Sequence, residues 1–133
     1  MPGPAPKDPK NKFMKLPAEG RKGRAPKWPL SEPLPGEAAV WKELWSSPQA
    51  VAWERLRYVR VVARFCRLVV KAEEPDAGSR LLAEVRQMEH DLGLTPMGLR
   101  RLEWQIVEDE LAEKRKDAGR MSARERLAVA AGS

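Results

Sequence analysis

The side chains best suited to catalysis are few and scattered in this chain of 133 residues. A single cysteine, Cys66, excludes an internal disulfide and a cysteine-based zinc site. A single histidine, His90, excludes a site of paired histidines, and its position near a predicted helix end favours a capping role. No glycine-rich segment has the spacing of a phosphate-binding loop. The sequence therefore predicts a protein that is not an enzyme, with no cofactor and no bound metal.

One acidic cluster could in principle bind Mg²⁺, namely Glu108-Asp109-Glu110 with Glu103 and Glu113 nearby. On a predicted helix these carboxylates spread around most of the circumference instead of sharing one face. Two of them, Glu110 and Glu113, have lysines four and three residues later, as is common on exposed helices. We interpret the cluster as a solvent-facing helix surface.

The net charge of +6 is unevenly distributed. Residues 1–28 contain eight basic and two acidic side chains, so the other 105 residues are neutral overall. Residues 1–27 are also rich in proline and poor in large apolar groups, and we expect them to form a disordered arm. The segment Gly20–Trp28 is compact and basic, which is typical of chains that follow a polyanion backbone. Its candidate DNA-binding residues are Arg21, Lys22, Arg24 and Lys27.

A second group of cations repeats at intervals of three and four residues, which places them on one side of a helix. This basic stripe has two interpretations. It can bind phosphates, with Arg60 and Arg64 as the favoured ligands, or it can pair with the acidic excess of residues 72–117. The stripe consists of Arg57, Arg60, Arg64, Arg67 and Lys71.

The body is predicted to be all-α, a small helical bundle or long helical hairpin without strands. We expect helices over about 36–46, 48 to 71–74 with a bend near Trp53, 77–91 and 96–116. Tryptophans near the first two helices are expected to supply much of the core. The segment Leu92-Gly93-Leu94-Thr95-Pro96 has the glycine, cap and proline that end one helix and begin the next.

The last predicted helix carries two apolar stripes about 120° apart. An ordinary surface helix needs only one, so the second favours contact with another copy of the chain, although a central position in its own bundle is the alternative. A DNA-reading helix-turn-helix with Arg100 and Arg101 is also possible, but a hairpin used for assembly fits the two apolar stripes better. The predicted oligomer interface is Leu99, Leu102, Trp104, Ile106, Val107 and Leu111.

Three motifs in this order resemble the phage terminase small subunit family. They are the basic segment Gly20–Pro26, the segment Leu44–Ala50 followed by Trp53, and Leu92–Pro96 at the start of a long helix. The resemblance implies a homo-oligomeric ring that binds double-stranded viral DNA and delivers it to the terminase large subunit, which holds the ATPase and nuclease. It also implies a location in the cytoplasm of the bacterial host, and the lack of any run of 18 apolar residues predicts no membrane association.

The resulting organisation has a disordered arm over 1–27, a body for DNA recognition and oligomerisation over 28–116, and a flexible tail over 117–133. By analogy with the family, we expect the tail to dock the large subunit. The alternative function is a small oligomeric adaptor whose basic arm binds an acidic protein without contacting DNA.

Overall fold

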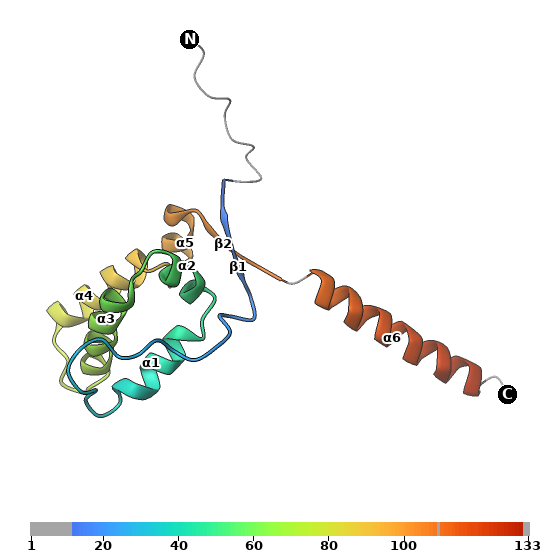
Figure 1. Ribbon diagram of the computed structural model, residues 1–133, viewed down its shortest axis with the longest axis horizontal. Helices are drawn as coiled ribbons and strands as arrows, with labels where there is room; N and C mark the ends of the chain where they lie inside the picture. The colour runs from blue at the N-terminus through green and yellow to red at the C-terminus, as the bar shows by residue number, and fades with distance from the viewer. Residues whose placement is uncertain (1–11, 109, 132–133) are drawn as a thin grey trace, which may run out of the picture.

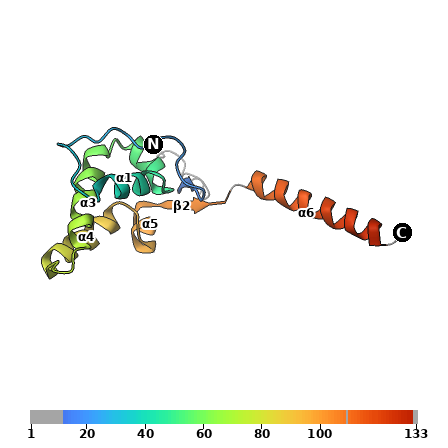
Figure 2. The same cartoon turned by 90° about the horizontal axis from the view of Figure 1, so that it is seen from below.

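The computed structural model describes residues 12–108 and 110–131. Five helices form a bundle, and a sixth projects away from it at one end (Figures 1 and 2). Helix α3 packs against α1 and α4, while α5 packs against α4 and β2. No described helix is long and apolar enough to cross a membrane. The elements are β1 (Met14–Pro17), α1 (Glu37–Trp45), α2 (Gln49–Arg55), α3 (Val59–Ala72), α4 (Ser79–Asp91), α5 (Pro96–Leu102), β2 (Trp104–Val107) and α6 (Glu110–Ala131).

The predicted helix over 96–116 is wrong, and so is the expectation that no strands occur. Helix α5 ends at Leu102, and Glu103 takes the left-handed conformation with φ 61°. The chain then forms β2, which pairs in parallel with β1 in the register Met14↔Trp104 to Pro17↔Val107. The strand partner comes from the N-terminal segment, so helical periodicity within 96–116 could not reveal it. The fold is therefore mostly helical, not all-α.

The predicted second helix is divided in two. Residues 56–58 separate α2 from α3, and Arg57 at the break has φ 59°. No glycine or proline causes this break. Helix α2 buries Ala52 and Trp53, and α3 buries Val62 and Phe65, in the same core. We attribute the change of direction to the burial of both apolar faces.

The tryptophans form a continuous edge-to-face ladder, which confirms their predicted place in the core. Trp28 lies 5.0 Å from Trp41, Trp41 lies 5.5 Å from Trp45, and Trp45 lies 5.7 Å from Trp53, measured between ring centroids. The indole of Trp53 donates a 3.0 Å hydrogen bond to the Leu92 carbonyl. The ladder thus joins residues 28–53 to the turn that follows α4.

That turn has the geometry predicted for residues 92–96. Gly93 has φ 75°, and a Cβ there would lie only 2.5 Å from the Trp104 ring. The Thr95 hydroxyl accepts a 2.9 Å hydrogen bond from the Gly98 amide and caps α5, while Pro96 takes the first helical position. The side chains of His90 and Thr95 also form a 2.6 Å hydrogen bond, so His90 contacts the residue that caps α5.

The expectation of a disordered arm over 1–27 is not confirmed for residues 12–27; residues 1–11 lie outside the described residues. Strand β1 buries Leu16 completely. Residues 18–36, here called the strap, then cross the bundle towards α1 (Figures 1 and 2). At Gly20 the chain is so close to α1 that a Cβ would lie 2.0 Å from the Ser46 carbonyl oxygen, and its φ is +88°.

Candidate nucleic-acid interface

Most of the basic stripe lies exposed on α3. Arg60, Arg64 and Lys71 project from the helix, and Arg57 lies in the break before it. Among the residues that the structure describes, none of these four is in an ion pair. The stripe is therefore not paired with those acidic residues of 72–117 whose side chains the structure describes, contrary to one interpretation. Its single ion pair within the described residues joins Arg67 to a residue of α1.

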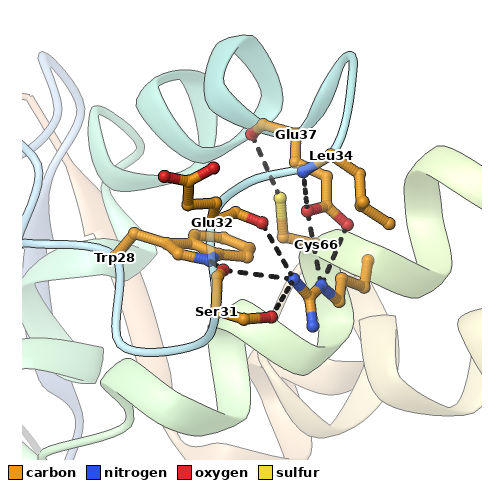
Figure 3. Close-up of polar contacts among 7 residues, drawn as sticks. Trp28, Ser31, Glu32, Leu34, Glu37 and Cys66 are labelled. Atoms are coloured by element: carbon orange, nitrogen blue, oxygen red, sulfur yellow. Dashed lines mark hydrogen bonds and ion pairs between the residues drawn. The ribbon is translucent and has the colours of Figure 1, made fainter.

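Arg67 is held by the strap and by α1, through the labelled residues Ser31, Glu32 and Glu37 of Figure 3. Its Nε donates to Oε1 and Oε2 of Glu37 at 3.3 and 3.2 Å, and its Nη2 donates to Ser31 and to the Glu32 carbonyl. The guanidinium also stacks over Trp28, 5.5 Å from the ring centroid. These contacts occupy the Arg67 guanidinium. Arg67 therefore has a structural role, unlike the exposed cations of the stripe.

The partner carboxylate, Glu37, is only 1% exposed. It accepts a further 2.7 Å hydrogen bond from the Leu34 amide, so its oxygens have three donor contacts. A buried carboxylate needs such compensation, because removal from water is costly for an ion. The Glu37–Arg67 pair, here called the clasp, fastens the far end of the strap to α3.

Beside the clasp lies the only cysteine of the chain. Its Sγ donates a 3.4 Å hydrogen bond to the Glu37 carbonyl. Burial raises the pKa of Cys66 to about 11, with a smaller raising effect from Glu37 and an opposing one from Arg67. The thiol is therefore neutral near pH 7 and is unsuited to act as a nucleophile.

The near end of the strap is fastened by Arg21. Its Nε forms an ion pair with Glu54 of α2, and its Nη1 donates a 3.0 Å hydrogen bond to the Arg24 carbonyl. The guanidinium also lies 5.5 Å from the centroid of the Trp45 ring. The other candidate cations of the strap, Lys22, Arg24 and Lys27, are exposed and have no ion pair within the described part of the chain.

The residues predicted as an oligomer interface do not form two faces of one helix. Trp104 is 6% exposed and packs within its own chain, whereas Ile106 is 39% exposed. Leu99, Leu102 and Val107 are half-buried, and Leu111 belongs to α6, where its side chain is outside the described set. Three other large apolar side chains are exposed farther along α6, at Met121, Leu127 and Val129. The flexible tail expected over 117–133 is instead helical as far as Ala131, because α6 spans Glu110–Ala131.

The residues considered for metal binding are also dispersed. Glu103 forms a 3.2 Å ion pair with Lys12, and Glu108 is exposed. Over residues 12–108 and 110–131, no group of three or more His, Cys, Asp and Glu side chains could hold a metal ion.

Comparison with known proteins gives one match. The sequence model of a family described as phage terminase small subunit matches residues 1–130. No curated protein and no solved structure matches the chain. Because the match covers nearly the whole sequence, this chain belongs to the phage terminase small subunit family.

Proposed function

We propose that this chain is the non-catalytic DNA-recognition subunit of a phage packaging motor. It binds double-stranded viral DNA and brings it to the terminase large subunit in the cytoplasm of the bacterial host. Family membership supports this role, because terminase small subunits are generally the non-catalytic component. The observation that carries the DNA contact is the set of exposed cations on α3 and the strap that form no ion pair with any described residue.

Such cations attract the phosphate backbone without reading the base sequence, because they displace condensed counterions. For sequence selection we propose α4, the turn at Gly93 and α5 as a helix-turn-helix. Helix α5 exposes Met97, Arg100 and Arg101 on the side that would enter the major groove. The cations would then position the DNA, and α5 would read it.

Replacing Arg60 and Arg64 together by glutamine tests the DNA contact. The slope of log K against log salt concentration should fall by about 1.8, since each lost phosphate contact removes about 0.9. Fluorescence anisotropy with duplex DNA at several salt concentrations measures this slope. The control is Arg115→Gln with Arg124→Gln, which removes the same charge from exposed positions of α6 and should leave the slope nearly unchanged.

An equal loss of slope in both variants would show that net charge alone matters and would contradict a site on α3. Absence of DNA binding by the wild-type chain, together with tight binding to an acidic protein, would favour the adaptor function.

We also propose that the subunit assembles into a homo-oligomeric ring, and α6 supports this assembly. The helix stands apart from the bundle (Figure 1) and exposes Met121, Leu127 and Val129 by 62%, 70% and 75%. A helix with several exposed large apolar side chains is stabilised when a second chain covers them. In a chain of this size, another copy is the simplest partner.

Replacing Met121 and Leu127 together by serine should therefore lower the mass measured by sedimentation equilibrium to that of the single chain. The matched control is Leu82→Ser, which alters an exposed leucine of α4 and should leave the mass unchanged. If the α6 variant keeps the wild-type mass, the assembly does not depend on α6.

A further inference from the structure

The strap is attached to the bundle at both ends. At its beginning, Arg21 forms an ion pair with Glu54, and the Arg21 amide donates a 3.2 Å hydrogen bond to the Ser47 carbonyl. At its end, Ser31 accepts two hydrogen bonds from Arg67 of α3. Between these points, the Trp41 indole donates a 2.8 Å hydrogen bond to the Pro26 carbonyl. The strap therefore runs antiparallel to α1, fixed at three places.

The same attachments place two sets of cations beside each other. Arg21 contacts both the Glu54 carboxylate and the Arg24 carbonyl, so the first cations of the strap lie near the end of α2 and the break at Arg57. At the other end, Trp28 and Ser31 lie against Arg67, which shares its face of α3 with Arg60 and Arg64. One row of cations follows the strap and the other follows α3.

We infer that the strap is a rigid half of a composite DNA-binding surface, and that Arg21, Glu54 and Arg67 are positioning residues within it. The inference rests on the proposed DNA-binding function. The phosphate ligands are then Lys22, Arg24 and Lys27 in the strap row, opposite Arg57, Arg60 and Arg64 in the α3 row. The ligand is the backbone of one duplex segment that contacts both rows.

Rigidity has a measurable consequence for affinity. A flexible arm must lose backbone and side-chain freedom when it binds, whereas a strap that is already fixed loses much less. Detaching the strap should therefore weaken DNA binding even when every cation of the two rows remains. A flexible tether would bind equally well before and after such a change.

The first experiment removes the near attachment without altering the net charge, through Arg21→Gln with Glu54→Gln. DNA affinity should fall by roughly tenfold, and trypsin should cleave after Lys22 and Arg24 faster than in the wild-type protein. The matched control is Asp117→Asn with Arg120→Gln, which removes another exposed ion pair, on α6, and should change neither measurement.

The second experiment keeps all cations. Gly20→Ala should displace the strap, because the added Cβ meets the Ser46 carbonyl oxygen at 2.0 Å. The control Gly36→Ala has a similar φ of +89° but only an ordinary 3.5 Å contact with Val70, so it experiences the same backbone strain without the clash. Circular dichroism at increasing temperature confirms that each variant is folded at the assay temperature.

The inference is supported if Gly20→Ala and the Arg21/Glu54 variant both bind DNA more weakly than their controls. It is overturned if the wild-type protein binds DNA and both variants bind equally well, or if trypsin cleaves the wild-type strap as fast as an unfolded peptide. A wild-type protein that does not bind DNA at low salt would instead overturn the proposed function.

Discussion

Replacing Trp104 by alanine is expected to lower the free energy of unfolding by about 3–5 kcal/mol. The indole of Trp104, the first residue of β2, is buried against the turn at Gly93. Its removal therefore leaves a cavity in the core. The control on the same strand is Ile106→Ala, which should cost about 1 kcal/mol or less because its side chain is substantially exposed. Urea denaturation followed by tryptophan fluorescence and circular dichroism measures both values.

The same variant distinguishes a core residue from an interface residue. A core role predicts loss of stability that does not depend on protein concentration. If Trp104→Ala keeps the stability of the single chain and only lowers the oligomeric mass, the interface interpretation from the sequence is correct and the core role described above is wrong.

The second large effect is expected at the clasp. Arg67→Ala should lower the free energy of unfolding by about 3–5 kcal/mol, because the buried Glu37 carboxylate loses its cation. By contrast, Arg64→Ala should change stability by no more than about 0.5 kcal/mol, since Arg64 is exposed and in no ion pair among the described residues. Differential scanning calorimetry of the two variants gives the comparison.

A double variant shows whether an uncompensated charge is the cause. Glu37→Gln combined with Arg67→Met removes both charges and should recover part of the stability lost in Arg67→Ala. A double variant that is less stable than Arg67→Ala would show that the clasp stabilises the fold mainly through its hydrogen bonds to the strap. In DNA binding both variants should be weaker than the wild type, Arg64→Ala through loss of a proposed phosphate ligand and Arg67→Ala through release of the far end of the strap.

Local signals in the sequence predicted the parts of the fold that depend on neighbouring residues. The turn over 92–96 follows from Gly93, Thr95 and Pro96, whose conformational preferences act within a few residues. The helices expected over 36–46 and 77–91 agree closely with α1 and α4. The tryptophans were placed in the core because such large rings can hardly be accommodated elsewhere in a small bundle.

The errors in the N-terminal segment and at β2 involve contacts between distant segments. The strand at Trp104–Val107 exists because residues 14–17 lie beside it, and those residues were assigned to a disordered arm. Charge and proline content indicated the disorder, but Leu16 is buried and Gly20 packs closely on Ser46. Such contacts are invisible to a helical wheel or a local composition window.

In the candidate site, too, the sequence predicted what depends on neighbouring residues but not what depends on distant contacts. The spacing of the basic stripe correctly placed Arg60, Arg64, Arg67 and Lys71 on one face of α3. Which of these cations is free for a ligand depends on Glu37, a residue of another helix that the sequence gives no reason to expect in the core. Fold and charge pattern are thus partly local properties, whereas the assignment of ligands requires the tertiary structure.

The pairing of β1 with β2 has a consequence for synthesis of the protein. Residues 14–17 are synthesised well before their hydrogen-bonding partners, 104–107. A nascent or truncated product that stops before Trp104 therefore lacks the strand that seats the N-terminal segment. Such a product cannot acquire the native arrangement of residues 14–17.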